Sequence, residues 1–215
     1  TCALPISALL FSGITEKNLS VTYLSIGNSD CTHIETPDGS SILIDAGIEN
    51  PYNHSNSSRV VPYLKHKRAG DIDLLVLTSD VSKDFQVLRN LTENFTVHRI
   101  ILDNKNELGS NSENLLAEHR IQYDDVRDVD MISGFGNVRI YFLKSPAVKS
   151  FMVKLIYGNT SFLFPGRSEM DSETEYISAY KEILKSDILK AAKYGSDKST
   201  SQEFLRAVKP DACVI

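Results

Sequence analysis

The sequence predicts an α/β domain in which helices lie outside a pair of packed sheets. Three observations lead to this prediction: short β-branched runs open the chain, strand and helix patterns then alternate, and the second half repeats that style. A length of 215 residues suffices for one large domain with a buried core. With 41% hydrophobic and 24% charged residues, the composition is that of an ordinary globular chain. We therefore expect a single domain.

This single domain is expected to span residues 18–215, because the first 17 residues do not fit the pattern. Their apolar stretch from Ala3 to Ile14 is too short to span a bilayer. We interpret residues 1–17 as the remnant of a signal peptide or linker, or as a sequence artefact. Residue 215 falls within an expected late strand, so the domain is expected to be truncated at its C-terminal end.

Three expected strands open the domain as an antiparallel unit. Residues 19–26, 31–36 and 40–44 are alternating or β-branched, and Pro37-Asp38-Gly39 supplies a turn between the second and the third. A polar loop at residues 49–58, rich in Asn and Ser, should then connect the sheet to the first helix.

An alternation of helices and strands is expected next. Val60 begins a helical pattern that closes with Lys65-His66-Lys67-Arg68, cations that suit the negative end of a helix dipole, and Gly70 should end this helix. The apolar run 72–77 is typical of a strand covered on both faces. Further helices are expected near residues 83–92 and 113–120, and further strands at 97–102 and 121–123.

The second half repeats this style. Strands are expected at residues 138–143, 151–157, 161–164 and 187–190, and helices near 172–184 and 201–208. The run Ser133-Gly134-Phe135-Gly136-Asn137 is expected to separate the two halves, since glycine interrupts regular structure.

Charge and reactive residues exclude several function classes. The net charge of −5 supplies no global attraction to polyanions, so nucleic acid is a weak candidate partner. The cysteines are far apart and odd in number, which predicts small buried residues and neither a disulfide framework nor a zinc knuckle. The histidines are scattered without ligand spacing and are expected at the surface or partly buried. These residues are Cys2, Cys31 and Cys213, and His33, His54, His66, His98 and His119.

Specific strings from residue 19 onward resemble the ComEC-type branch of the metallo-β-lactamase superfamily, the extracytoplasmic domain of competence proteins. The resemblance implies an αββα sandwich, a zinc- or manganese-dependent hydrolase such as a phosphodiesterase or nuclease related to DNA uptake, and a membrane-linked parent protein. It also implies an extracytoplasmic or membrane-associated location. The matching strings are residues 24–30, 36–39, 42–47, 60–64, 72–78, 157–164 and 190–210.

The metal-ligand positions of that family are replaced in this chain. In the family, the strand corresponding to residues 72–77 leads into H-x-H-x-D-H, whose ligand positions fall here on Ser79, Val81, Lys83 and Asp84. None of the expected ligands is retained at these four positions. The first metal motif is therefore degenerate.

The remaining ligand positions are also changed. The bridging aspartate falls on Arg167, and the H-H-G-S string reads Lys193-Tyr194-Gly195-Ser196. Lysine and arginine carry no free lone pair at neutral pH and add positive charge to a cation site. Only Asp45 keeps its family type, and in the family it is a supporting residue. The sequence therefore predicts a non-catalytic relative, a pseudoenzyme with no metal, no cofactor and no catalytic residue.

Two interpretations of the replaced site remain open. Lys83, Arg167 and Lys193 could form structural ion pairs with nearby aspartates, or they could bind a phosphate or carboxylate together with Ser196. Possible partners are thus a small anion or another protein. We call the residues of this region the vestigial pocket: Asp45, Ser79, Asp80, Lys83, Asp84, Arg167, Lys193, Tyr194 and Ser196.

A rival interpretation is an active metal-dependent phosphodiesterase or nuclease with rearranged ligands. Asp80 and Asp84, with Asp45 and Asp197, would then supply oxygen donors for magnesium or manganese. Lys83 beside them argues against this site.

Overall fold

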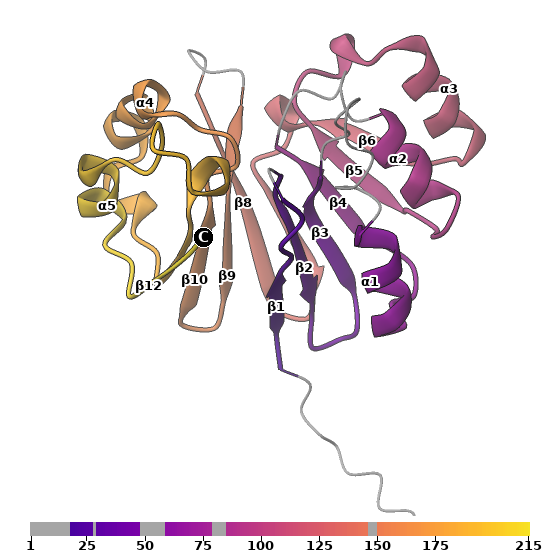
Figure 1. Ribbon diagram of the computed structural model, residues 1–215, viewed down its shortest axis with the longest axis horizontal. Helices are drawn as coiled ribbons and strands as arrows, with labels where there is room; N and C mark the ends of the chain where they lie inside the picture. The colour runs from indigo at the N-terminus through magenta and orange to yellow at the C-terminus, as the bar shows by residue number, and fades with distance from the viewer. Residues whose placement is uncertain (1–17, 28, 48–58, 79–84, 146–149) are drawn as a thin grey trace, which may run out of the picture.

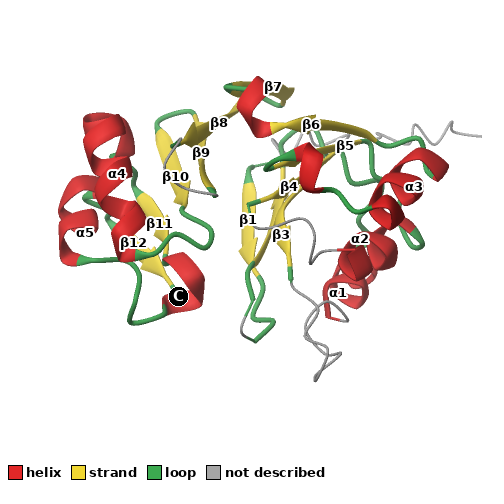
Figure 2. Cartoon of the chain, turned by 90° about the horizontal axis from the view of Figure 1, so that it is seen from above, coloured by secondary structure: helices red, strands yellow, loops and turns green. Residues whose placement is uncertain are grey.

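Two six-stranded sheets pack face to face, and helices cover both outer faces (Figures 1 and 2). The structure is a computed structural model that describes residues 18–27, 29–47, 59–78, 85–145 and 150–215. The predicted α/β sandwich with helices outside paired sheets is confirmed. The predicted antiparallel pairing of the first three strands of the domain is confirmed as well.

The first sheet has the strand order β1-β2-β3-β4-β5-β6. Its first three strands pair antiparallel, and β3 to β6 pair parallel because helices connect them. Its strands are β1 (Ser20–Tyr23), β2 (Cys31–Glu35), β3 (Ser41–Ala46), β4 (Leu74–Leu77), β5 (Arg99–Leu102) and β6 (Gln122–Asp125), and its helices are α1 (Val60–Lys67), α2 (Phe85–Thr92) and α3 (Ser110–Glu118).

The second sheet has the order β12-β11-β10-β9-β8-β7. Strands β7 to β10 pair antiparallel, whereas β10, β11 and β12 pair parallel. Its strands are β7 (Met131–Phe135), β8 (Val138–Lys144), β9 (Phe151–Tyr157), β10 (Thr160–Phe164), β11 (Ile188–Lys190) and β12 (Ala212–Val214), and its helices are α4 (Met170–Tyr180) and α5 (Gln202–Val208).

Strand β4 shows why its run is continuously apolar. Leu74 and Val76 pack between the sheets, whereas Leu75 and Leu77 pack against the helices. Successive side chains of a strand point to opposite faces, so both faces of a doubly covered strand must be hydrophobic. The prediction of a strand buried on both faces is confirmed, although it begins at Leu74 and not at Ile72.

Two predicted boundaries were wrong. Residues 133–137 do not separate the halves, because they close the β7–β8 hairpin, and the halves are joined instead by a short 3₁₀ turn at Val126–Asp128. Helix α1 ends before Gly70, since Arg68 adopts a left-handed conformation and its N–H bonds back to the carbonyls of Leu64 and Lys65.

Two side chains also differ from their predicted exposure. Cys213 on the edge strand β12 is exposed, although Cys31 is buried as expected. His33 is 1% exposed, because it points from β2 under helix α1. Within the described ranges, no helix combines the length and the hydropathy that crossing a membrane requires.

Candidate functional site

Several described residues of the vestigial pocket follow strand ends in both sheets. Asp45 lies near the end of β3, Thr78 follows β4, and Arg167 follows β10. The C-terminal ends of parallel strands are where α/β proteins commonly place their sites. Ser79, Asp80, Lys83 and Asp84 lie outside the described residues.

Asp45 is held by two hydrogen bonds from Thr78. The Thr78 N–H donates to Oδ1 and the Thr78 hydroxyl to Oδ2, each at 2.8 Å. Burial raises the pKa of Asp45 to about 7, and Asp30 adds to this shift, whereas the bonds from Thr78 and the charge of Arg167 oppose it. Both carboxylate oxygens are therefore engaged within the protein.

Gly166, in the loop after β10 of the second sheet, packs against Thr78, the hydrogen-bond partner of Asp45. Its φ is +59°, and a Cβ built on it would lie 2.4 Å from the Thr78 hydroxyl oxygen. Its carbonyl also accepts a hydrogen bond of 2.8 Å from the N–H of Lys193. Only glycine fits this position, which connects the loop after β10 to both Thr78 and Lys193.

Two of the three predicted cations, Arg167 and Lys193, lie within the described residues, and they have different carboxylates beside them. Lys193 forms an ion pair with Glu169, the residue preceding α4, and this contact lowers the pKa of Glu169. Arg167 acts electrostatically on both Asp45 and Glu169. The structure thus brings Arg167 near Asp45 and directs Lys193 to a partner that the sequence did not suggest.

Ser196 lies in a tight loop. The two preceding residues of its motif, Lys193 and Tyr194, have φ values of +46° and +49°. The Ser196 hydroxyl oxygen lies 3.4 Å from the Asp197 carboxylate and 3.3 Å from the Lys198 backbone nitrogen. Neither contact supplies an imidazole, so the hydroxyl lacks the usual base for nucleophilic activation.

A buried glutamate fixes this loop. Glu173 on α4 is 0% exposed, and its carboxylate accepts the N–H groups of Thr200 and Ser201 at 2.5 and 2.9 Å. The Thr200 hydroxyl in turn accepts the Ala192 N–H at 3.0 Å. The loop therefore has a preorganised backbone, which the sequence did not predict.

Replacing Glu173 with glutamine is expected to lower the free energy of unfolding by about 2 kcal/mol, because an amide cannot accept both N–H groups as a carboxylate does. Urea denaturation measures this loss. Glu203→Gln on the exposed face of α5 is the control and should change little. Equal effects of the two substitutions would contradict the structural role assigned to Glu173.

An ion pair between the sheets was also missed. Lys190 at the end of β11 lies 2.9 Å from Asp30, and the two side chains are only 12% and 14% exposed. Asp30 ends the matching string 24–30 and Lys190 begins the string 190–210. Their places in these strings were the only sign in the sequence that they matter. The pair lies near the vestigial pocket, since the charge of Asp30 also raises the pKa of Asp45.

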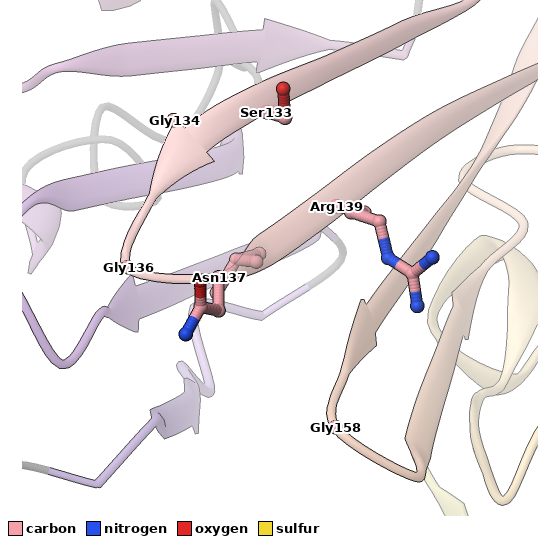
Figure 3. Close-up of a pocket in the computed structure, with 7 residues that line it drawn as sticks. Ser133, Gly134, Gly136, Asn137, Arg139 and Gly158 are labelled. Carbon is pink, nitrogen blue, oxygen red and sulfur yellow. The ribbon is translucent and has the colours of Figure 1, made fainter.

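Two cavities lie at the opposite end of the sandwich. One, of about 710 Å³, is formed by the β7–β8 and β9–β10 turns; of its described lining residues Arg139 alone is charged, and the others are glycines, Ser133, Asn137 and Val138 (Figure 3). The other, of about 410 Å³, is lined by His33, Glu35, Ser41 and Arg68 with their neighbours. Both are distinct from the vestigial pocket.

No protein-family model matches the chain. The chain is 24% identical to ComE operon protein 3 of Bacillus subtilis strain 168 over an alignment of 217 residues. This alignment covers 91% of the chain and 28% of that protein. The chain therefore spans little more than a quarter of that relative.

Solved structures agree on the fold. The metallo-β-lactamase fold protein YhfI of Bacillus subtilis matches 92% of this chain and 85% of its own, at 14% identity and a TM-score of 0.61. This chain has the metallo-β-lactamase fold. The diiron β-hydroxylase CmlA of Streptomyces venezuelae matches 92% of this chain and 44% of its own, at 15% identity and a TM-score of 0.58. The predicted resemblance to ComEC-type domains is confirmed by these comparisons.

The described residues of this region do not fit the metal centre that the fold family implies. The resemblance aligns Arg167 and Lys193 with ligand positions, and both oxygens of Asp45 accept hydrogen bonds from Thr78. Within the described ranges, no three histidine, cysteine, aspartate or glutamate side chains cluster to hold a metal ion. Zinc requires several such donors converging at about 2.0–2.3 Å.

Proposed function

We propose that this domain is a non-catalytic metallo-β-lactamase-fold module of a competence-type protein, in which ion pairs replace the metal. The observation that carries the proposal is the ion pair of Lys193 with Glu169, since the resemblance aligns Lys193 with a metal ligand. The more enclosed pair of Lys190 with Asp30 supports it, because these side chains are only 12% and 14% exposed and breaking a buried pair is costly even where forming it gains little.

A structural role is favoured over an anion pocket at this site. Lys190 and Lys193 both have carboxylate partners, so their charges are already compensated. Arg167 acts on Asp45 and Glu169, which would repel an incoming anion. The module would therefore support a partner protein or the rest of a larger chain and would not bind a free phosphate here.

The ComE operon relative extends this proposal to location. Because the chain covers 28% of that protein, we propose that this domain belongs to a larger protein, with the membrane-associated or extracytoplasmic location that the resemblance to competence proteins implies. The competence relation also makes a metal-dependent phosphodiesterase or nuclease the rival function.

The purified protein is expected to hold metal only far below one equivalent and to show no phosphodiesterase turnover with manganese, magnesium or zinc, because cations occupy the ligand positions. Metal analysis by mass spectrometry and hydrolysis of a chromogenic phosphodiester measure both properties.

The outcome that would overturn the proposal is stoichiometric metal together with turnover that disappears in Asp84→Ala. Asp71→Ala is the matched control, because Asp71 precedes β4 at the opposite end of that strand and pairs with His98. Turnover that survives both substitutions would indicate a contaminating enzyme.

A further inference from the structure

The cavity of about 410 Å³ lies at the base of the first sheet, far from the vestigial pocket. Ser41 begins β3 and Asp45 lies near its end, so about 13 Å of strand separates the two sites. The cavity walls come from the start of β1, the end of β2, the β2–β3 turn and the segment after α1. Segments distant in sequence thus converge on one hollow.

A buried histidine forms one wall of this base cavity. His33 Nε2 lies 3.0 Å from the Ser41 hydroxyl, and Nδ1 lies 3.3 Å from the Tyr63 hydroxyl on α1. Burial and the nearby Lys67 lower the pKa of His33, against the opposing effect of Glu35. The imidazole is therefore neutral at pH 7 and has polar partners at both nitrogens.

Among the described residues, one cation, Arg68, and one carboxylate, Glu35, line the base cavity. Helix α1 ends in Lys65, His66 and Lys67 just before Arg68, so positive charge gathers on the helix side of the cavity. No carboxylate of the described residues forms an ion pair with Arg68. Lys67 lies 3.6 Å from Glu35, but both side chains are about 40% exposed, so this pair contributes little.

We propose that the base cavity binds a compact oxyanion, a phosphate group or a carboxylate carried by a small molecule. The guanidinium of Arg68 would form paired hydrogen bonds with such an anion, and the Ser20 hydroxyl, also at the wall, is a further donor. Lys67 lies beside Glu35, the carboxylate of the wall, and reduces its repulsion of the anion. This site does not depend on the proposed function of the vestigial pocket.

The proposal implies a dependence on pH. An anion in the cavity favours the imidazolium form of His33, so acidification should strengthen binding. The other groups around this imidazole are Glu35 on its own strand, Tyr63 and Lys67 on α1, Arg68 after it, and Asp73, which accepts the Ser41 N–H. Lys67 and burial oppose protonation of His33, and a bound anion would offset them.

Titration of the whole chain with inorganic phosphate, followed by NMR of backbone amides, tests the binding site. Saturable shifts in the low millimolar range are expected at Gly39 and Gly70, which line the cavity. Arg68→Gln should weaken binding about tenfold, the loss of one charged pair. Arg89→Gln is the control, because Arg89 lies on α2 and pairs with Glu93. Arg167→Gln should leave the affinity unchanged.

Sulfate tests the dependence on pH, because it stays a dianion throughout. It should bind about threefold or more tightly at pH 5.5 than at pH 7.5, owing to His33. The proposal fails if phosphate causes no saturable shift, if Arg68→Gln binds as well as the parent, or if sulfate binds equally at both pH values. Loss of binding in Arg167→Gln would place the anion in the vestigial pocket and would also overturn it.

Discussion

Alanine at position 166 is expected to lower the free energy of unfolding by about 3 kcal/mol or more. The new Cβ would lie 2.4 Å from the Thr78 hydroxyl oxygen, which donates to Asp45, and the backbone there has a φ of +59°. The substitution therefore combines a steric clash with an unfavourable backbone conformation. Urea denaturation monitored by circular dichroism measures the loss.

Gly158→Ala is a matched control for this prediction. Gly158 has a φ of +57°, but no atom lies within 4 Å of the position its Cβ would take. The Gly158→Ala variant should lose only about 1 kcal/mol of its free energy of unfolding, because only the cost of the left-handed backbone conformation remains. Equal losses at positions 158 and 166 would show that the contact between Gly166 and Thr78 contributes nothing to stability.

Most of the fold was predictable because its hydrophobic pattern is local. Strand β4 is apolar along its whole length since it is covered on both faces, and the Pro37–Gly39 turn joins two alternating strands. Strand β7 was missed because its Ser133 and Gly134 are exposed on a sheet edge and lack an apolar pattern. Edge strands have one unpaired side, so sequence constrains them less.

The residue types of the candidate site could be predicted from the sequence, but not their ion-pair partners. That Arg167 and Lys193 stand at replaced metal-ligand positions rests on the resemblance and stays a prediction. Which carboxylate each cation meets depends on backbone geometry, and the left-handed conformations of Lys193 and Tyr194 belong to the loop that places Lys193 beside Glu169. The contact between Asp30 and Lys190 depends on the packing of two sheets, which no local pattern encodes.

Replacing Asp45 with asparagine is expected to stabilise the protein increasingly as pH rises. Burial raises the pKa of Asp45 to about 7 from its ordinary value of 3.8, so the folded state binds an extra proton between these values. The protonated carboxyl of Asp45 contributes fully to the free energy of unfolding below about pH 3.8, and this contribution is lost as pH rises through 7. Asparagine is neutral at every pH, so the variant loses no stability from this position as pH rises.

The stability difference between Asp45→Asn and the parent should therefore grow by about 2–4 kcal/mol from pH 4 to pH 8 in favour of the variant. Urea denaturation across this range measures it.

Asp187→Asn is the control of opposite sign. Hydrogen bonds from the N–H and hydroxyl of Ser161 lower the pKa of Asp187, so its charged form stabilises the fold. That contribution is present above the unfolded pKa and is lost as pH falls through the folded one, so the variant should be less stable at neutral pH and approach the parent in acid. If the difference between Asp45→Asn and the parent were flat across pH, the pKa of Asp45 would be the same in the folded and unfolded states, which would contradict the rise by burial.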